Sequence, residues 1–223
     1  MPAEYAFDSQ SHIVQDRLPP HKSRAEFIDF LRHKSSSNHL GPGEDRVDGS
    51  IEWAALATGY PLLTRLGRGH LGLDMKWLSG TVYGTGDERF AASSEEFIGR
   101  AVRAVIENWS VVRGHYLGCC EIWASINDVV RELEKAQHTE WTLVHVEAEK
   151  CIEEGQKRLQ GGWPDAGMFL AERSLLCDEN AWSAFKDDQI MTSKLNVQRQ
   201  GLHEILQGLL KEHKHQKGHC GCG

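Results

Sequence analysis

The residues with the clearest chemical potential lie at the end of the sequence, in KEHKHQKGHCGCG. Three imidazoles and two thiols fall close together there, supplied by His213, His215, His219, Cys220 and Cys222. Thiolate and imidazole ligands suit Zn(II), Cu(I) or Ni(II), because soft sulfur and borderline nitrogen match soft to borderline cations. The tail therefore predicts a transition-metal site, although a solvated tail without a bound ion has the same composition.

A second, weaker metal candidate lies inside the chain. His115 and Cys119 are four residues apart, and His145 and Glu149 share that spacing, which places each pair on one face if the segment is helical. In a helical bundle the four side chains could converge on a metal or a cofactor. The simpler interpretation makes Cys119 a small core residue and His115 a residue at the edge of the core.

The elements that would position these residues are predicted to be long helices. Apolar residues recur at alternating spacings of three and four from Ile98 to Leu133, which is the period of an amphipathic helix. Glycine is absent from 120–154, and Pro164 can begin a further helix. We expect a mainly α fold, an up-and-down bundle of long helices that pack together or as a homodimer through coiled-coil contacts. Whether 94–160 forms one helix or two stays open.

The first part of the chain differs from this pattern in its turn residues. Ten of the 22 glycines lie between residues 41 and 86, and short apolar runs separate them. We expect short helices over 23–34, 51–58 and 61–66. The chain is thus divided into a turn-rich segment over 1–92, a helical bundle over 93–212 and a His/Cys-rich tail over 213–223.

The same region contains a glycine motif with a known use. Gly67, Gly69 and Gly72 match G-x-G-x-x-G, which binds a dinucleotide when a strand precedes it and a helix opens directly from it. Here the preceding run, PLLTRL, is predicted to be a helix. A glycine-rich turn is therefore the better interpretation.

Two other classes of function remain as alternatives. Residues 51–84 allow a helix-turn-helix with Arg65, Arg68 and Lys76 nearby, so a dimeric transcriptional regulator is one alternative. An enzyme with a metal or cofactor pocket inside the bundle, near His115 and His145, is the other.

The charge and hydrophobicity of the chain limit the partners and the location that we expect for it. The chain has 223 residues with 25 Lys+Arg against 32 Asp+Glu, and residues 1–92 are themselves slightly acidic, so nucleic acid is an unfavourable partner. No apolar run approaches the ~20 residues of a bilayer span, and no secretory signal is visible, so we expect a cytoplasmic protein without membrane contact. The function expected is that of a soluble helical metal-binding protein in an accessory or metal-handling role.

Overall fold

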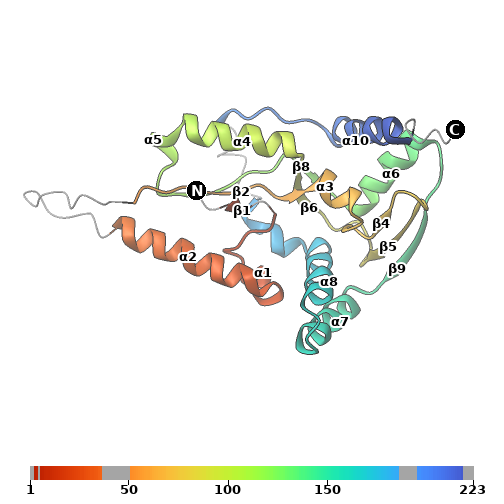
Figure 1. Cartoon of the computed structure of the whole chain (residues 1–223), viewed down its shortest axis with the longest axis horizontal. Coiled ribbons are helices and arrows are strands. Elements are labelled where there is room, and N and C mark those ends of the chain that lie inside the picture. Colours follow the sequence, from red (N-terminus) through yellow and green to blue (C-terminus); the bar gives the residue numbers. More distant parts are fainter. Residues whose placement is uncertain (1–2, 5, 37–50, 186–194, 218–223) are drawn as a thin grey trace, which may run out of the picture.

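Helices and short strands alternate along the chain in the computed structural model, which describes residues 3–4, 6–36, 51–185 and 195–217 (Figure 1). The strands are β1 (Ala3–Glu4), β2 (Ala55–Ala57), β3 (Tyr60–Pro61), β4 (Leu73–Asp74), β5 (Ser79–Tyr83), β6 (Phe90–Ser93), β7 (Tyr116–Gly118), β8 (Ile122–Ala124) and β9 (Thr142–Val146). The helices are α1 (His12–Arg17), α2 (Pro19–Ser36), α3 (Leu62–Gly67), α4 (Glu95–Glu107), α5 (Trp109–Val112), α6 (Ile126–Gln137), α7 (Ala148–Gln160), α8 (Pro164–Leu176), the 3-10 helix η1 (Glu179–Phe185) and α10 (Leu202–Lys217).

The strands form three small sheets, and most of their pairings are parallel. The first sheet has the order β1-β2-β7, with all three strands parallel. In the second, β6 pairs with β3 in parallel and with β8 in antiparallel orientation, and in the third β5 pairs with β4 in antiparallel and with β9 in parallel orientation. Strands from both sides of residue 92 therefore pair with one another. No observation tests the predicted division into 1–92, 93–212 and 213–223, and it stays a prediction.

Helices cover both faces of the first sheet, as parallel strands require. Along β2, Ala55 packs with Ile28 and Leu31 of α2, whereas Leu56 packs with Phe97 and other buried residues of α4. Figure 1 shows α2 and α4 on opposite sides of β1 and β2. Successive side chains of a strand point to opposite faces, so a short run of apolar residues can fill two cores at once.

The prediction of an up-and-down bundle is wrong. The apolar stripe over 98–133 is divided among α4, α5, β7, β8 and α6. Gly114 adopts a left-handed conformation with φ of 78°, which ends the helical path before β7. The spacing of the apolar residues continues across this break, because each short element presents its own apolar residues to the core. The long helix and the coiled-coil contacts expected from it are absent from the described residues.

Two shorter predictions fail for the same reason, since strands replace helices. The run over 51–58, expected as a helix, forms the buried strand β2, and the segment over 94–160, expected as one helix or two, includes the strand β9. A buried parallel strand is apolar throughout, so its periodicity does not separate it from a short buried helix. The helix expected over 61–66 is present as α3, and the helix expected at Pro164 is present as α8.

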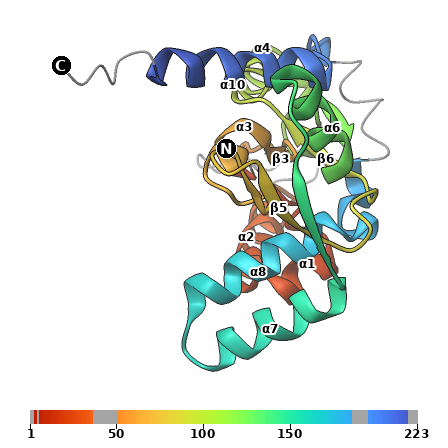
Figure 2. The same ribbon diagram turned by 90° about the vertical axis from the view of Figure 1, so that its right-hand side faces the viewer.

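Helices α7 and α8 form a hairpin that projects from the body of the molecule, and α10 lies across α3 and α6 on another side (Figure 2). The two hairpin helices approach closely at Gly155 and Gly167, where a Cβ on Gly167 would lie 2.9 Å from the carbonyl oxygen of Gly155. None of the helices in the described part of the chain is long and apolar enough to cross a membrane. The expected cytoplasmic location stays a prediction.

Replacing Gly72 by alanine should destabilise the fold by about 2 kcal/mol more than the same change at Gly114. Both glycines have positive φ, 85° and 78°, so alanine is strained at either position. A Cβ on Gly72 would also overlap the carbonyl oxygen of Thr81 in β5, whereas one on Gly114 would meet no atom within 4 Å. Urea unfolding of the two variants measures the difference, and equal losses would contradict the close approach at Gly72.

Candidate functional site

A groove of about 650 Å³ opens where five elements meet, and it is the candidate site. Its walls come from the end of α3 and the following turn, from the region of β4, and from single residues of α6, α8 and α10. The lining residues are Leu66, Gly67, Arg68, Gly69, Gly72, Leu73, Asp74, Met75, Lys76, Gln137, Arg173 and Leu210. Concave surfaces of this size, partly apolar and with a few polar groups, are the usual form of small-molecule sites.

Arg173 of α8 is held rigidly at this groove. Its Nε donates to the carbonyl oxygen of His70 at 3.2 Å, and its Nη2 donates to that of Gly69 at 2.9 Å. Its guanidinium lies over the ring of Phe169, 4.1 Å from the centroid, and 5.9 Å from that of Tyr83. Stacking and two hydrogen bonds fix the plane of the guanidinium before any ligand binds.

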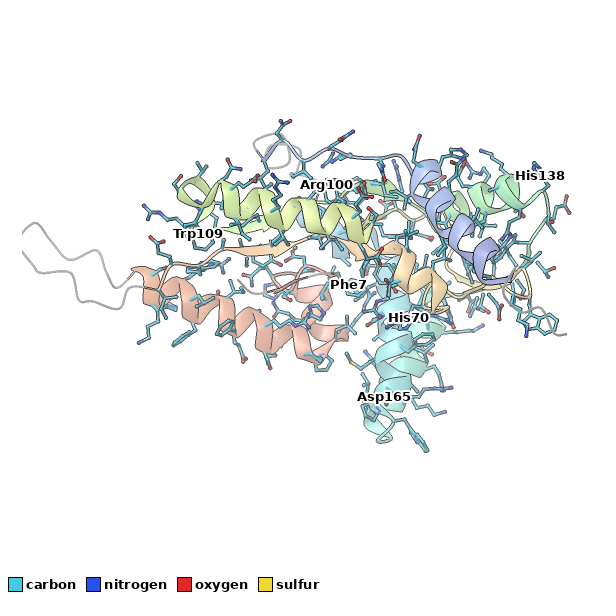
Figure 3. The ribbon with its side chains drawn as sticks, turned by 45° about the horizontal axis from the view of Figure 1, so that its top comes forward. Phe7, His70, Arg100, Trp109, His138 and Asp165 are labelled. Atoms are coloured by element: carbon cyan, nitrogen blue, oxygen red, sulfur yellow. The ribbon has the colours of Figure 1, made fainter. Side chains whose placement is uncertain are left out.

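Beside the groove, His70, Arg65 and Glu172 form a polar cluster (Figure 3 labels His70). The Nη1 atom of Arg65 lies 2.9 Å from His70 Nδ1 and 2.9 Å from Glu172 Oε2. Burial, followed by the charge of Arg65, lowers the pKa of His70 below its ordinary value of 6.5, although Glu172 opposes this effect. At neutral pH the ring is uncharged, and Nδ1 accepts from Arg65 while Nε2 carries the proton.

Tyr60 lies under this cluster but is not accessible to a ligand. Its side chain is fully buried, its hydroxyl has no hydrogen-bond partner among the residues that the structure describes, and the Arg65 guanidinium lies 5.7 Å from its ring centroid. Burial, assisted by Glu172, raises the pKa of this phenol well above 10. Tyr60 therefore supplies packing and not a proton at neutral pH.

The carboxyl ends of the parallel strands carry polar residues that are already engaged. Beyond β1, Asp8 accepts from the Tyr116 hydroxyl at 2.8 Å, and Ser9 Oγ lies 2.7 Å from His21 Nδ1. Beyond β7, Glu121 accepts from both the backbone N–H and the hydroxyl of Ser94. The polar groups at these strand ends are therefore already hydrogen-bonded within the protein, at the edge where open α/β sheets generally bind their ligands.

The structure does not bring the predicted internal metal ligands together. His115 is exposed before β7, Cys119 is buried after it, His145 is exposed on β9 and Glu149 is exposed on α7. No group of three His, Cys, Asp or Glu side chains in the described residues could hold a metal ion. Burial also raises the pKa of the Cys151 and Cys177 thiols to about 12 and about 11, so neither is a thiolate at neutral pH.

The structure leaves the metal ligands predicted in the tail untested and contradicts the predicted helix-turn-helix. His213 and His215 fall in α10, whereas His219, Cys220 and Cys222 lie outside the described residues, so their binding of a metal remains untested. The helix-turn-helix is wrong, because its first helix is the strand β2. Of its basic residues, Arg68 and Lys76 line the groove and Arg65 pairs with Glu172.

Sequence reasoning did not single out Arg173, Glu172 or His70 as site residues. The three glycines at 67, 69 and 72 mark the turn whose carbonyl groups Arg173 binds, so they were the available signal for the position of the site. That turn follows α3 and leads into β4, and it does not open a helix.

Comparison with solved structures defines the fold as a Rossmann-like α/β fold. The chain superposes on an NADPH-dependent quinone oxidoreductase from Escherichia coli in complex with NADPH, with a TM-score of 0.60, 15% identity, and 92% of this chain and 64% of that chain covered. For an isoflavone reductase the TM-score is 0.59 at 15% identity, with 81% and 54% covered. For a nucleoside-diphosphate-sugar epimerase from Staphylococcus aureus it is 0.55 at 20% identity, with 92% and 63% covered.

Two fungal proteins are similar in sequence, and both carry the name oxidoreductase. Oxidoreductase aprR of Aspergillus flavus is 24% identical over 213 residues, which covers 95% of this chain and 67% of that protein. Oxidoreductase poxI of Penicillium oxalicum is 22% identical over 149 residues, which covers 65% of this chain and 48% of that protein. The chain thus spans about half to two thirds of the length of these relatives. No protein-family model matches it.

These similarities overturn the functional predictions from sequence. A metal-handling role and a transcriptional regulator are wrong, because the similar proteins are oxidoreductases and the similar folds are those of reductases and an epimerase. The transition-metal cofactor is wrong in the same way, since a nicotinamide cofactor is the one that the similar structures indicate. Self-association and the absence of nucleic acid and membrane partners stay predictions.

The described residues do not fit the phosphates of a nicotinamide dinucleotide. Such phosphates need unengaged backbone N–H groups at a glycine-rich turn between a strand and a helix. The junction between β6 and α4 joins a strand to a helix, but it contains no glycine, and the Glu121 carboxylate already accepts from Ser94 there. Gly59 follows β2, but a Cβ at that position would lie 2.8 Å from the carbonyl oxygen of Ala91, so its space is filled by protein backbone.

Proposed function

We propose that the chain supplies the substrate-binding part of an oxidoreductase that reduces an organic carbonyl or quinone compound with a nicotinamide cofactor. The observation that carries this proposal is the similarity to oxidoreductase aprR along 95% of the chain, in a fold that an NADPH-dependent reductase shares. The groove beside Arg173 is the substrate site in this proposal. The chain's contribution is to bind and orient the compound, because the described residues offer no site for the cofactor phosphates.

The test begins with binding of oxidised compounds to the purified chain. A panel of quinones, aryl ketones and conjugated enones is titrated and followed by two-dimensional NMR. We expect at least one class to bind saturably, with the amide signals of residues 66–76 and 173 shifting most. If nothing in the panel shifts these signals up to about millimolar concentration, an affinity too weak for a substrate, the groove is not the substrate site.

NADPH should bind this chain weakly, because the pyrophosphate lacks a cradle of unengaged N–H groups. We expect no saturation by calorimetry below about 1 mM, a limit equivalent to roughly 4 kcal/mol of binding free energy. Consumption of NADPH with a bound panel compound, followed at 340 nm, should accordingly rise in proportion to NADPH without a plateau. The absence of any consumption above the protein-free rate would contradict the oxidoreductase proposal, and micromolar binding would contradict the assignment of the phosphate site.

A further inference from the structure

We propose that the ligand of this groove is an organic acid, a molecule with an apolar or aromatic body whose carboxylate is bound by Arg173. The inference rests on the proposed function in one respect, since it takes the groove to be the substrate site. It goes further by naming the class of compound, which neither the fold nor the similar proteins specify.

The first support for this proposal is that Arg173 has N–H groups that can still donate hydrogen bonds to a ligand. Two of its five N–H groups are used, by the carbonyl oxygens of His70 and Gly69. The remaining three, two on Nη1 and one on Nη2, have no partner among the described residues, and no carboxylate there forms an ion pair with this side chain. A planar guanidinium fixed in this way can receive a carboxylate through two parallel hydrogen bonds.

The neighbouring arginine gives an internal comparison. Arg65 lies on the same side of the cluster but is neutralised by Glu172, with 2.9 Å between Arg65 Nη1 and Glu172 Oε2. Both arginines are half-buried. Of the two, only Arg173 lines the groove and only Arg173 is without a described counter-ion. A partly desolvated charge without a partner favours binding of an anion from solution.

The charged residues around the groove have the same sign. Arg68 and Lys76 are exposed at its rim and form no ion pair within the described part of the chain. Among the described residues that line the groove, Asp74 is the only acidic one, and its Oδ1 accepts from the backbone N–H groups of Lys76 and Trp77 at 2.8 and 3.0 Å. Three cations against one engaged carboxylate give the groove a positive potential, which attracts anions.

The rest of the wall is apolar and defines the body of the ligand. Leu66 and Leu73 form the buried floor, and Met75 and Leu210 are half-buried. Such a wall favours a compact hydrocarbon or aromatic group and disfavours a second charge. A positive charge beside an apolar wall favours an organic acid over inorganic phosphate. Phosphate would bind the charge but leave the apolar wall in contact with water.

The test compares an acid with its neutral ester. Benzoylformate is the probe, because it joins a phenyl ring, a reducible ketone and a carboxylate, and methyl benzoylformate differs only at the carboxylate. By calorimetry at low ionic strength we expect the acid to bind at least about tenfold more tightly than the ester, as charge-assisted bidentate bonds do. The preference should decrease as salt is added. Equal affinities of acid and ester would overturn the proposal.

Variants locate the effect in the groove. Arg173→Gln should remove the preference for the acid over the ester, and the double variant Arg68→Gln, Lys76→Gln should lower this preference by about threefold. The control is Arg158→Gln, an exposed arginine that pairs with Glu154 on α7. A preference that survives Arg173→Gln would overturn the proposal. If that variant does not fold, the Nε–H signal of Arg173 in the native chain decides, since it should shift with the acid and not with the ester.

Failure of this inference and failure of the proposed function have different signatures. An acid that binds at Arg173 without supporting any NADPH consumption would remove the oxidoreductase proposal and leave the ligand class intact. A neutral ketone or quinone that binds in the groove and is reduced, with no preference for the acid, would support the oxidoreductase proposal and contradict the assignment of an organic acid as the ligand.

Discussion

Replacing Glu121 by alanine should lower the free energy of unfolding by about 3 to 5 kcal/mol, the usual cost of removing one partner from a buried charged network. The Glu121 side chain is fully buried and binds three parts of the chain. Oε2 accepts from the N–H and the hydroxyl of Ser94, and Oε1 accepts from Arg100 at 3.3 Å and from the Gln200 N–H at 3.1 Å. Alanine leaves these donors without their acceptor.

The control for this prediction is Glu107→Ala on α4. Glu107 is exposed and pairs with Arg103 at 2.7 Å, a surface contact worth about 0 to 1 kcal/mol. Glu121→Gln, which keeps one acceptor oxygen, should fall between the two. Urea unfolding, with the slope checked for a change in two-state behaviour, measures all three variants. Losses within 1 kcal/mol of each other for the two alanine variants would show that Glu121 does not hold these elements together.

Acidification from pH 6.5 to pH 4 should lower the stability of the chain by about 3 kcal/mol through His21 alone. Burial, followed by the charge of Arg24, lowers the pKa of His21 from 6.5 to about 4. The unfolded chain then binds a proton between these two pH values that the folded chain does not, so stability falls as pH falls. Well above pH 6.5 and well below pH 4 the contribution of His21 is constant.

Two variants separate the causes of this effect. His21→Gln should flatten the dependence of unfolding free energy on pH between 6.5 and 4. Ser9→Ala removes the 2.7 Å contact to Nδ1 but leaves the ring buried, so most of the dependence should remain. The His21 ring protons, followed by NMR, provide a direct titration. A midpoint near 6.5 in the native chain would be incompatible with the burial argument.

Local signals in the sequence predicted some elements well. Pro164 begins α8, as its missing N–H and fixed φ favour, and the short helix predicted over 61–66 is present as α3. Both predictions rest on contacts within a few residues, which a sequence pattern records directly.

The strands and the groove could not be predicted in this way. Ala55 belongs to a strand because it pairs with Tyr116, and Gly80 because it pairs with Leu143, so distant partners decide both. The groove combines residues 66–76 with Gln137, Arg173 and Leu210, and no spacing in the sequence relates these positions. The conspicuous His/Cys tail drew the functional prediction instead, since it is the only cluster of ligand-type residues that is local.

The parallel pairing of β2 with β7 also sets the order in which the chain can fold as it is synthesised. The apolar run over 53–57 leaves the ribosome about sixty residues before its partner strand, and β5 precedes β9 by a similar distance. Until the later strands emerge, β2 lacks its β7 neighbour and the cover of α4. Contacts this far apart form slowly and leave unpaired apolar strands exposed in the meantime. The nascent chain therefore exposes an apolar segment that the finished fold conceals.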